Sequence, residues 1–333
     1  MLTEPHSVEL VDFYVKALST RPTTAGDRTL GATSSKTHRS TVDAAVIAAR
    51  WGTSLGTAEQ TLRTTTQRGD RCLHGNLNRR FRTRQTQLRR NLLRTAVYSD
   101  TLFSDTKSVR GYTCAPLFVT SEGIADGNVI TTKSDAYLQL NDFCREHGIP
   151  DPLVTDMAPE ETEGDWKTVV KQNLIKQQTT EAYSPWQNRC EKEIGELKRH
   201  CSRISHRHRV PARLWCFTWQ YTLKIRQHIA RSTANDRTPY ESLKGETPDI
   251  SALIEFDYYS YYVKVRLPTG FPNDDWILAR WLGPADGIGQ GLTYYYVIKE
   301  NGQVIARFTV RPLLPEEWTS ELRRRREWLS IQN

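Results

Sequence analysis

The segments PLVTD (152–156) and AYSPWQNRCEKEIGELKR (182–199) decide the fold of this chain. In the first, a short apolar run bounded by proline and polar residues predicts the end of a buried strand, with Asp156 at its tip. The second predicts a loop that leads into a helix carrying Glu191. An earlier apolar run predicts another strand, which ends at Asp100.

These three carboxylates are candidate metal ligands. Mg²⁺ prefers oxygen ligands, and two such ions clamp the attacking and leaving oxygens of an in-line phosphoryl transfer. Taken singly, Asp100, Asp156 or Glu191 would serve equally well as a cap or a surface residue. Together they favour a two-metal phosphoryl-transfer site.

Composition points to an anionic partner. The 333 residues suggest two or three domains, 38% are apolar, and the net charge is +8 with a pI near 9.2. Between Arg63 and Arg94 there are ten arginines and one acid, Asp70, so this run either follows a phosphate backbone or forms a solvated face. The alternative for the whole chain is a merely soluble basic protein.

The six cysteines are scattered and form no CxxC pair, which favours reduced thiols inside a cell. No apolar run approaches the ~18 residues of a membrane span, and the N-terminus has no signal-peptide pattern. Cys72 and His74 alone cannot fill a tetrahedral zinc site, so no zinc is expected.

Before the first acid, the residues at 41–69 predict two helices joined by a glycine-containing turn. This segment is either a helix-turn-helix that contacts DNA or an ordinary helical hairpin.

The middle of the chain alternates between strand and helix patterns. Strands are predicted at 96–100, 113–120, 128–132, 152–156 and 174–179, and helices at 134–148, 160–172, 187–208 and from 211 onward. This order predicts an α/β layer fold with a mixed sheet.

After residue 245 the apolar period becomes that of strands, and a turn at 300–302 predicts a hairpin. Several short aromatic strands predict a small β-barrel, in which Arg280 and Arg307 either face DNA or belong to a purely structural barrel. The basic run Arg323–Arg326 in the tail is a candidate nuclear-import signal.

Four motifs in order resemble the retroviral and retrotransposon integrases of the D-D-E superfamily. Asp100, Asp156 and Glu191 resemble the acidic triad; YSPWQNRCE resembles Y-[ST]-P-x-x-N-G-x-x-E; TDMAPEE resembles D-N-G-G-E, with Glu160 at the matching position; and TPYESLKGETPDI resembles a stretch of copia-type integrases. The resemblance covers roughly 95–315.

The chain departs from this pattern in three places. Only 34 residues separate the second and third acids, which leaves Glu193 as an alternative to Glu191. The glycines after Asp156 are replaced by Met157, Ala158 and Pro159, and the N-terminal zinc module of the family is absent.

The resemblance implies a ribonuclease-H-like α/β fold with a mixed five-stranded sheet and flanking helices, an N-terminal helical segment and a small C-terminal β-barrel. The expected domains are a basic helical region (1–95), a catalytic core (96–235), a linker and barrel (236–316) and a basic helical tail (317–333).

It also implies metal-dependent 3′-end processing and strand transfer of retrotransposon DNA into target DNA, with Mg²⁺ or Mn²⁺ held by Asp100, Asp156 and Glu191. The expected partners are double-stranded DNA and further copies of the chain, with no membrane, in the nucleus or a virus-like particle. The alternatives are an inactive DNA-binding remnant and a related D-D-E nuclease or transposase.

Five residues near the triad are candidate DNA contacts. Tyr183, Gln187 and Asn188 are expected to touch terminal bases. Lys198 lies two helical turns after Glu191, and it and Arg199 either hold DNA phosphates or form a solvated face.

Overall fold

The computed structural model describes residues 20–21, 28–29, 43–67, 93, 95–156, 158–181, 188–245, 247–254, 258–259, 263–266, 276–288, 293–298, 302–308 and 310–312. They belong to two compact units. The larger unit takes in Val42–Arg68 and Thr83–Ser251. The smaller takes in Met1–Thr41, Gly69–Arg82 and Ala252–Asn333.

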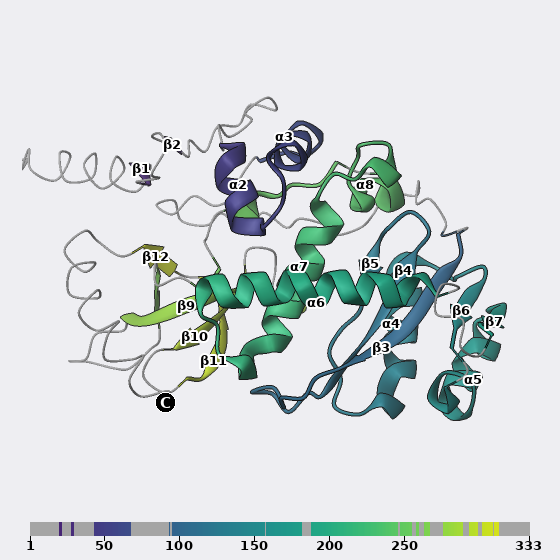
Figure 1. Ribbon diagram of the computed structural model, residues 1–333. Coiled ribbons are helices and arrows are strands. Elements are labelled where there is room, and N and C mark those ends of the chain that lie inside the picture. Colours follow the sequence, from purple (N-terminus) through teal and green to yellow (C-terminus); the bar gives the residue numbers. More distant parts are fainter. Residues whose placement is uncertain are drawn as a thin grey trace, which may run out of the picture. The chain divides into compact units, whose positions relative to one another are not determined.

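The larger unit is built on a mixed five-stranded sheet (Figure 1). Its strands are β3 (Val97–Phe103), β4 (Cys114–Thr120), β5 (Ala125–Asp126), β6 (Leu153–Thr155) and β7 (Gln177–Thr179). The spatial order is β5-β4-β3-β6-β7; the β3–β4 and β4–β5 pairs are antiparallel, whereas the β3–β6 and β6–β7 pairs are parallel. This topology confirms the predicted α/β, ribonuclease-H-like fold class.

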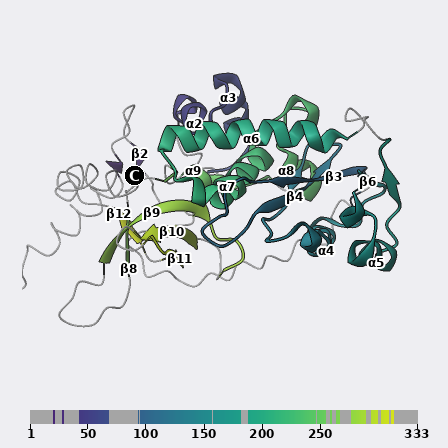
Figure 2. The same ribbon diagram turned by 60° about the horizontal axis from the view of Figure 1, so that its bottom comes forward.

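Helices cover both faces of the sheet, with α6 on one side and α4 and α5 on the other (Figure 2). All seven residues of β4 are buried, as expected of a strand covered on both faces. The helices and short 3₁₀ turns of this unit are α2 (Ala44–Trp51), α3 (Leu55–Thr64), η1 (Lys133–Asp135), α4 (Ala136–His147), η2 (Pro159–Glu161), α5 (Gly164–Gln172), α6 (Arg189–His208), η4 (Ala212–Leu214), α7 (Trp215–His228), η5 (Ser232–Ala234) and α8 (Pro239–Lys244). The four-residue helix α9 (Ser251–Ile254) follows at the boundary between the units.

Aromatic side chains fix α4 and α5 against the sheet. The ring centroids of Phe118 on β4 and Phe143 on α4 are 5.0 Å apart, and Phe118 also stacks on Trp166 of α5 at 6.4 Å. All three side chains are almost fully buried. Such aromatic packing supplies a large share of the hydrophobic stabilisation of the sheet.

The third strand was predicted at 128–132, and this prediction is wrong. The strand is β5, and its ladder with β4 ends at the Phe118–Asp126 pair. Pro116, further along β4, has no N–H with which to continue the ladder. Opposite it lies Gly127, where a Cβ would sit 2.0 Å from the Pro116 carbonyl oxygen. Ile130 therefore returns to β4 only as an isolated bridge.

The helical pair predicted at 41–69 is present as α2 and α3, joined at Gly52, which has a φ of 62°. The second helix ends at Thr64, earlier than the predicted glycine. The pair packs within the larger unit: the hydroxyl of Thr61 accepts a hydrogen bond from the Ala230 N–H at 3.0 Å, and the buried Trp51 carbonyl is bonded to the His200 ring.

The smaller unit contains a five-stranded antiparallel sheet. Its strands are β8 (Val263–Arg266), β9 (Trp276–Pro284), β10 (Tyr294–Ile298), β11 (Val304–Arg307) and β12 (Val310–Pro312), in the order β11-β10-β9-β8-β12. The predicted hairpin is confirmed by the β10–β11 pairing, and Gly302 in its turn has a φ of 67°. Trp281, Tyr294 and Tyr296 form a buried aromatic core. A two-residue pair, β1 (Thr20–Arg21) with β2 (Arg28–Thr29), also belongs to this unit.

The basic tail at 317–333 and its candidate import signal lie outside the described residues. Within the described part of the chain, none of the helices combines the length and the apolar character needed to cross a bilayer.

Candidate active site

The first two acids lie side by side because of strand register. Val97 on β3 pairs with Leu153 on the parallel strand β6, and Tyr98 with Val154. The same register carried forward sets Asp100 level with Asp156, one strand spacing of about 4.8 Å away. Each carboxylate accepts a hydrogen bond from a nearby backbone N–H, which orients it. Asp100 accepts from the Thr101 N–H at 2.7 Å, and Asp156 accepts from the Ala158 N–H at 3.0 Å.

Helix α6 begins beside β3 and carries the third acid, Glu191, close enough for its charge to act on Asp100. The buried Asn188 caps this helix: its Oδ1 accepts from the Cys190 N–H at 3.0 Å, and its Nδ2 donates to the Ser99 carbonyl at 3.1 Å. The first turn of α6 is thus fastened to β3 one residue before Asp100. Glu191 lies exposed in that turn.

The three carboxylates interact electrostatically. The pKa of Asp100 is raised to about 6, first by burial and then by the negative charges of Asp156 and Glu191. The Thr101 N–H and the Lys133 ammonium act in the opposite direction. A carboxyl pKa raised by burial and by neighbouring carboxylates is a frequent property of functional sites.

Glu193, the alternative third acid, forms ion pairs with two arginines. Its Oε1 accepts from Arg226 Nε at 2.7 Å and from Arg231 at 3.1 Å. Although burial opposes ionisation, the Arg231 and Arg226 guanidinium groups hold the pKa of Glu193 below its usual range. The geometry therefore favours Glu191 as the partner of Asp100.

A fourth carboxylate, Glu161, was missed by the sequence reasoning. It is 1% exposed, its Oε1 accepts from the Thr101 hydroxyl at 3.3 Å, and its Oε2 has no hydrogen-bond partner among the described residues. Burial, followed by the charges of Asp156 and Asp100, raises its pKa to about 8. The available signal was the Pro-Glu-Glu sequence that begins three residues after Asp156, where only Glu160 had been singled out.

The donor set fits a divalent cation such as Mg²⁺ or Mn²⁺. All the candidate ligand atoms are carboxylate oxygens, which such hard cations prefer. In addition, Oε2 of Glu161 is buried and has no hydrogen-bond partner among the described residues. Because the charges of both Asp156 and Glu191 act on Asp100, Asp100 would be the shared ligand of a two-ion arrangement.

A separate cluster has ligand atoms within 4.8 Å of one another: Asp126, Glu146 and His147. Asp126 and His147 form a hydrogen-bonded pair at 2.5 Å, and this pairing, together with the His147 charge, lowers the pKa of Asp126 against the opposing effect of burial. The pair ties the end of β5 to the end of α4, which accounts for the cluster as a structural contact.

The candidate DNA contacts are dispersed. Lys198 and Arg199 are both exposed on α6, whereas Asn188 is buried in its capping role. Tyr183 and Gln187 lie outside the described residues.

The two arginines of the smaller unit are less exposed than a DNA-facing role suggests. Arg280 on β9 is 8% exposed, with its guanidinium 4.3 Å from the centre of the Tyr259 ring. Arg307 on β11 is partly buried and donates to the Ala306 carbonyl at 2.8 Å.

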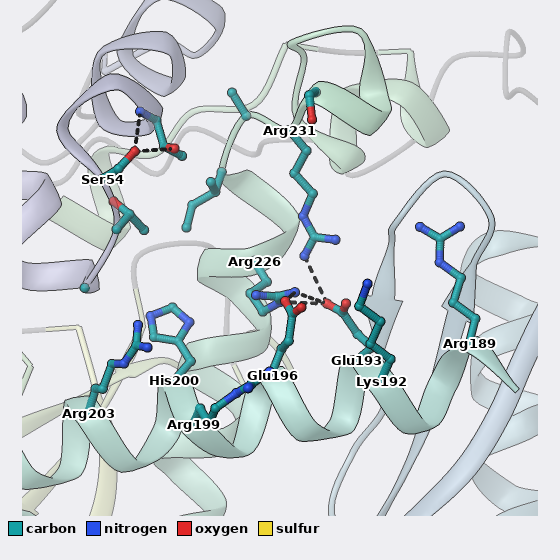
Figure 3. A pocket seen from close by; sticks show the side chains of 16 residues that line it. Ser54, Arg189, Lys192, Glu193, Glu196, Arg199, His200, Arg203, Arg226 and Arg231 are labelled. Carbon is teal, nitrogen blue, oxygen red and sulfur yellow. Dashed lines mark hydrogen bonds and ion pairs between the residues drawn. The ribbon is translucent and has the colours of Figure 1, made fainter. Parts of the chain in front are cut away.

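A cavity of about 590 Å³ lies along α6 (Figure 3). Arg199, Arg226 and Arg231 are among its lining residues, together with Glu193. The residues that line the cavity come from segments distant in sequence, so no local sequence motif could predict it.

No family model matches the chain, and no curated protein matches it. Solved structures that resemble it include chains from integrases and an intasome. A chain of the simian T-cell lymphotropic virus intasome in complex with the PP2A regulatory subunit B56 gamma is 15% identical, with a TM-score of 0.38, over 67% of this chain and 83% of that one.

Two catalytic cores are similar to a shorter stretch. The HTLV-2 integrase catalytic core domain in complex with magnesium, in a trimeric form, is 14% identical over 46% of this chain and 99% of its own, with a TM-score of 0.36. The BIV integrase catalytic core is 17% identical over 45% and 93%, also at 0.36. Because these scores lie below 0.5, the fold class rests on the sheet order and helix positions described above.

Proposed function

We propose that this chain is a polynucleotidyl transferase of the D-D-E type, which processes the 3′ ends of retrotransposon DNA, of copia type, and joins them to target DNA. The observation that carries the proposal is that the charges of Asp156, after β6, and Glu191, in the first turn of α6, both act on Asp100 of β3.

In this proposal Asp100 and Asp156 hold one Mg²⁺ or Mn²⁺, and Asp100 and Glu191 hold the other. Bound there, the ions would act as Lewis acids that activate water or a 3′-hydroxyl and stabilise the charge developing on the phosphate. The protein supplies position: the β3–β6 register fixes the two aspartates, and the Asn188 cap fixes the helix turn that carries Glu191.

DNA would be held by cations near this site. Lys198 lies two turns after Glu191 on the same side of α6 and would contact a phosphate, as would the adjacent Arg199. Tyr183 and Gln187 remain proposed contacts to terminal bases, and the smaller unit, with Arg280 and Arg307, a proposed DNA-binding module. Joining two DNA ends implies a multimer, in the nucleus or a virus-like particle.

The test is strand transfer. Purified protein is incubated with labelled duplexes carrying the terminal repeats that flank its coding sequence, with target plasmid and Mn²⁺, beside Asp156→Asn. Asp105→Asn serves as a control, because Asp105 is an exposed acid in the loop after β3. Joined product with wild type and the control, lost in Asp156→Asn, supports the proposal.

Two other results would favour a different function. Cleavage without joining, again dependent on Asp156, would identify a nuclease on the same fold. Salt-sensitive DNA binding that is equal in Mn²⁺ and EDTA, with no product from any protein, would identify an inactive DNA-binding remnant.

A further inference from the structure

The cavity beside α6 is separated from the candidate active site by the helix itself. At about 100° per residue, Glu193, Glu196, His200 and Arg203 lie about 120–180° around α6 from Glu191. All four line the cavity, whereas Glu191 does not. A ligand held by these four residues would therefore lie across α6 from one held by the acidic triad, whereas Lys192 and Arg199, about 100° and 80° around the helix from Glu191, lie at the edge between the two sites.

Positive charge dominates the cavity. Six cationic side chains line it: Arg189, Lys192, Arg199, Arg203, Arg226 and Arg231. Only two carboxylates, Glu193 and Glu196, oppose them, which leaves a surplus of four positive charges. In a concave site, such a surplus creates a focused positive potential that attracts anions.

Both carboxylates are hydrogen-bonded to arginines of the cavity lining. Glu193 bonds to Arg226 and Arg231, and Glu196 accepts from Arg226 at 3.0 Å, so the acids fix two of the guanidinium groups that line the cavity (Figure 3). Lys192, Arg199 and Arg203 are exposed, and no ion pair links any of them to the part of the chain that is described. The cavity is thus lined both by arginines fixed in ion pairs and by exposed basic side chains that can adjust to a ligand.

Neutral donors complete the lining. Helix α3 begins at the cavity, where its cap residue Ser54 shares a hydroxyl–hydroxyl hydrogen bond of 2.8 Å with Thr57, and both residues line the space. The N-terminal end of a ten-residue helix adds partial positive charge. Burial lowers the pKa of His200, which also lines the cavity, so that its ring contributes a neutral polar group.

We propose that this cavity is a binding site for clustered phosphate groups, distinct from the catalytic acids. Arginine-rich sites match the geometry of phosphate oxygens, and a volume of about 590 Å³ accommodates more than one phosphate. The phosphates belong to a nucleic-acid backbone or to a free polyphosphate. The site does not depend on catalysis; with a DNA backbone as ligand, it deepens the proposed function by giving α6 a second DNA contact.

The test is calorimetric titration of the full chain with inorganic tripolyphosphate, in EDTA so that no divalent ion bridges phosphate to the acids. The cavity variant is Lys192→Ala/Arg203→Ala, which removes two exposed cations. The matched control is Lys167→Ala/Lys171→Ala, which removes two exposed lysines from α5 on the opposite face of the sheet. Circular dichroism verifies that both variants are folded.

We expect one tripolyphosphate per chain, with affinity reduced at least about tenfold in the cavity variant and less than about twofold in the control. Equal affinity in the two variants, or no saturable binding to wild type, would overturn the proposal. Either result is independent of strand transfer, because the titration needs no metal and no reaction.

A second arm identifies the source of the phosphate. A duplex without element ends is added as a competitor of tripolyphosphate. Displacement that is lost in the cavity variant assigns the site to a nucleic-acid backbone, and failure to displace assigns it to a free polyphosphate. Both outcomes uphold phosphate binding.

Discussion

At the scale of single residues, the most unusual group is a carboxyl that the fold keeps protonated. Glu161 has a pKa of about 8 in the folded chain against a usual 4.5. Below pH 4.5 it is protonated in both the folded and unfolded states. Between pH 4.5 and 8 the folded state keeps a proton that the unfolded state releases, so the free energy of unfolding falls as pH rises.

The variant Glu161→Gln should remove this pH dependence, because glutamine keeps the shape without the charge. In EDTA at pH 8, the variant should be more stable than wild type by on the order of 3 kcal/mol, with little difference at pH 4.5. Urea unfolding at both pH values measures it. Glu163→Gln, an exposed neighbour, is the control; the same pH dependence in wild type and Glu161→Gln would rule out a buried neutral acid.

Divalent metal should stabilise the protein in a pH-dependent way. Since the pKa of Asp100 is about 6, protons compete with Mg²⁺ or Mn²⁺ below that value. The metal should raise the melting temperature by about 3 °C or more at pH 8 and by much less at pH 5. Asp100→Asn should show no such rise, and Asp105→Asn should behave as wild type.

Glu191 and Glu193 should respond to substitution in opposite ways. Glu193→Gln leaves Arg231 without its carboxylate and Arg226 with Glu196 alone, and it should cost about 2–3 kcal/mol of stability. Glu191→Gln removes an exposed acid and should leave stability nearly unchanged while abolishing stabilisation by metal. Urea unfolding with and without Mn²⁺ separates the two; the reverse pattern would make Glu193 the third acid.

At the scale of elements, the site depends on how α6 is attached to β3. Asn188 satisfies an N–H of the first helical turn and the Ser99 carbonyl of the strand at once. Because both the oxygen and the nitrogen of this buried amide are hydrogen-bonded, it fixes the orientation of α6 on β3 more strictly than apolar contacts alone would.

Asn188→Ala should therefore cost about 1–2 kcal/mol of unfolding free energy through the lost cap and the unpaired Ser99 carbonyl. Asn188→Ser, which keeps a cap acceptor, should recover part of it. Urea unfolding gives the ranking of the three proteins. Equal stability of the alanine and serine variants would mean that the cap contributes nothing.

At the scale of the whole molecule, the sequence allowed the fold class to be predicted, since apolar strands and amphipathic helices alternate along the chain. The three acids were singled out because each was expected at the end or start of a recognisable element; the strand predicted to end at Asp100 in fact continues to Phe103, so Asp100 lies within β3. Three features could not be predicted. The position of β5 depends on Pro116 meeting Gly127; the burial of Glu161 depends on packing beside Thr101; and the cavity unites α3, α6 and the residues after α7.

The basic character of the chain, +8 overall, leads to a last prediction about DNA affinity. Binding to duplex DNA should weaken steeply as salt rises, because phosphate contacts release counterions. Lys198→Ala should reduce the slope of log affinity against log salt by about 0.9, the value of one phosphate contact. Fluorescence anisotropy measures it; a slope unchanged from that of Lys167→Ala would remove Lys198 from the DNA-binding surface.

The parallel pairing of β3 with β6 has an evolutionary consequence. Asp100 and Asp156 are neighbours through the ladder, not through their distance along the chain. Insertions or deletions in the loops that join β4, β5 and α4 between the two strands leave the two acids adjacent, so the length of those loops can change without moving them. A single insertion within β3, between the paired residues and Asp100, would instead turn its carboxylate to the opposite face of the sheet and end the lineage of the site.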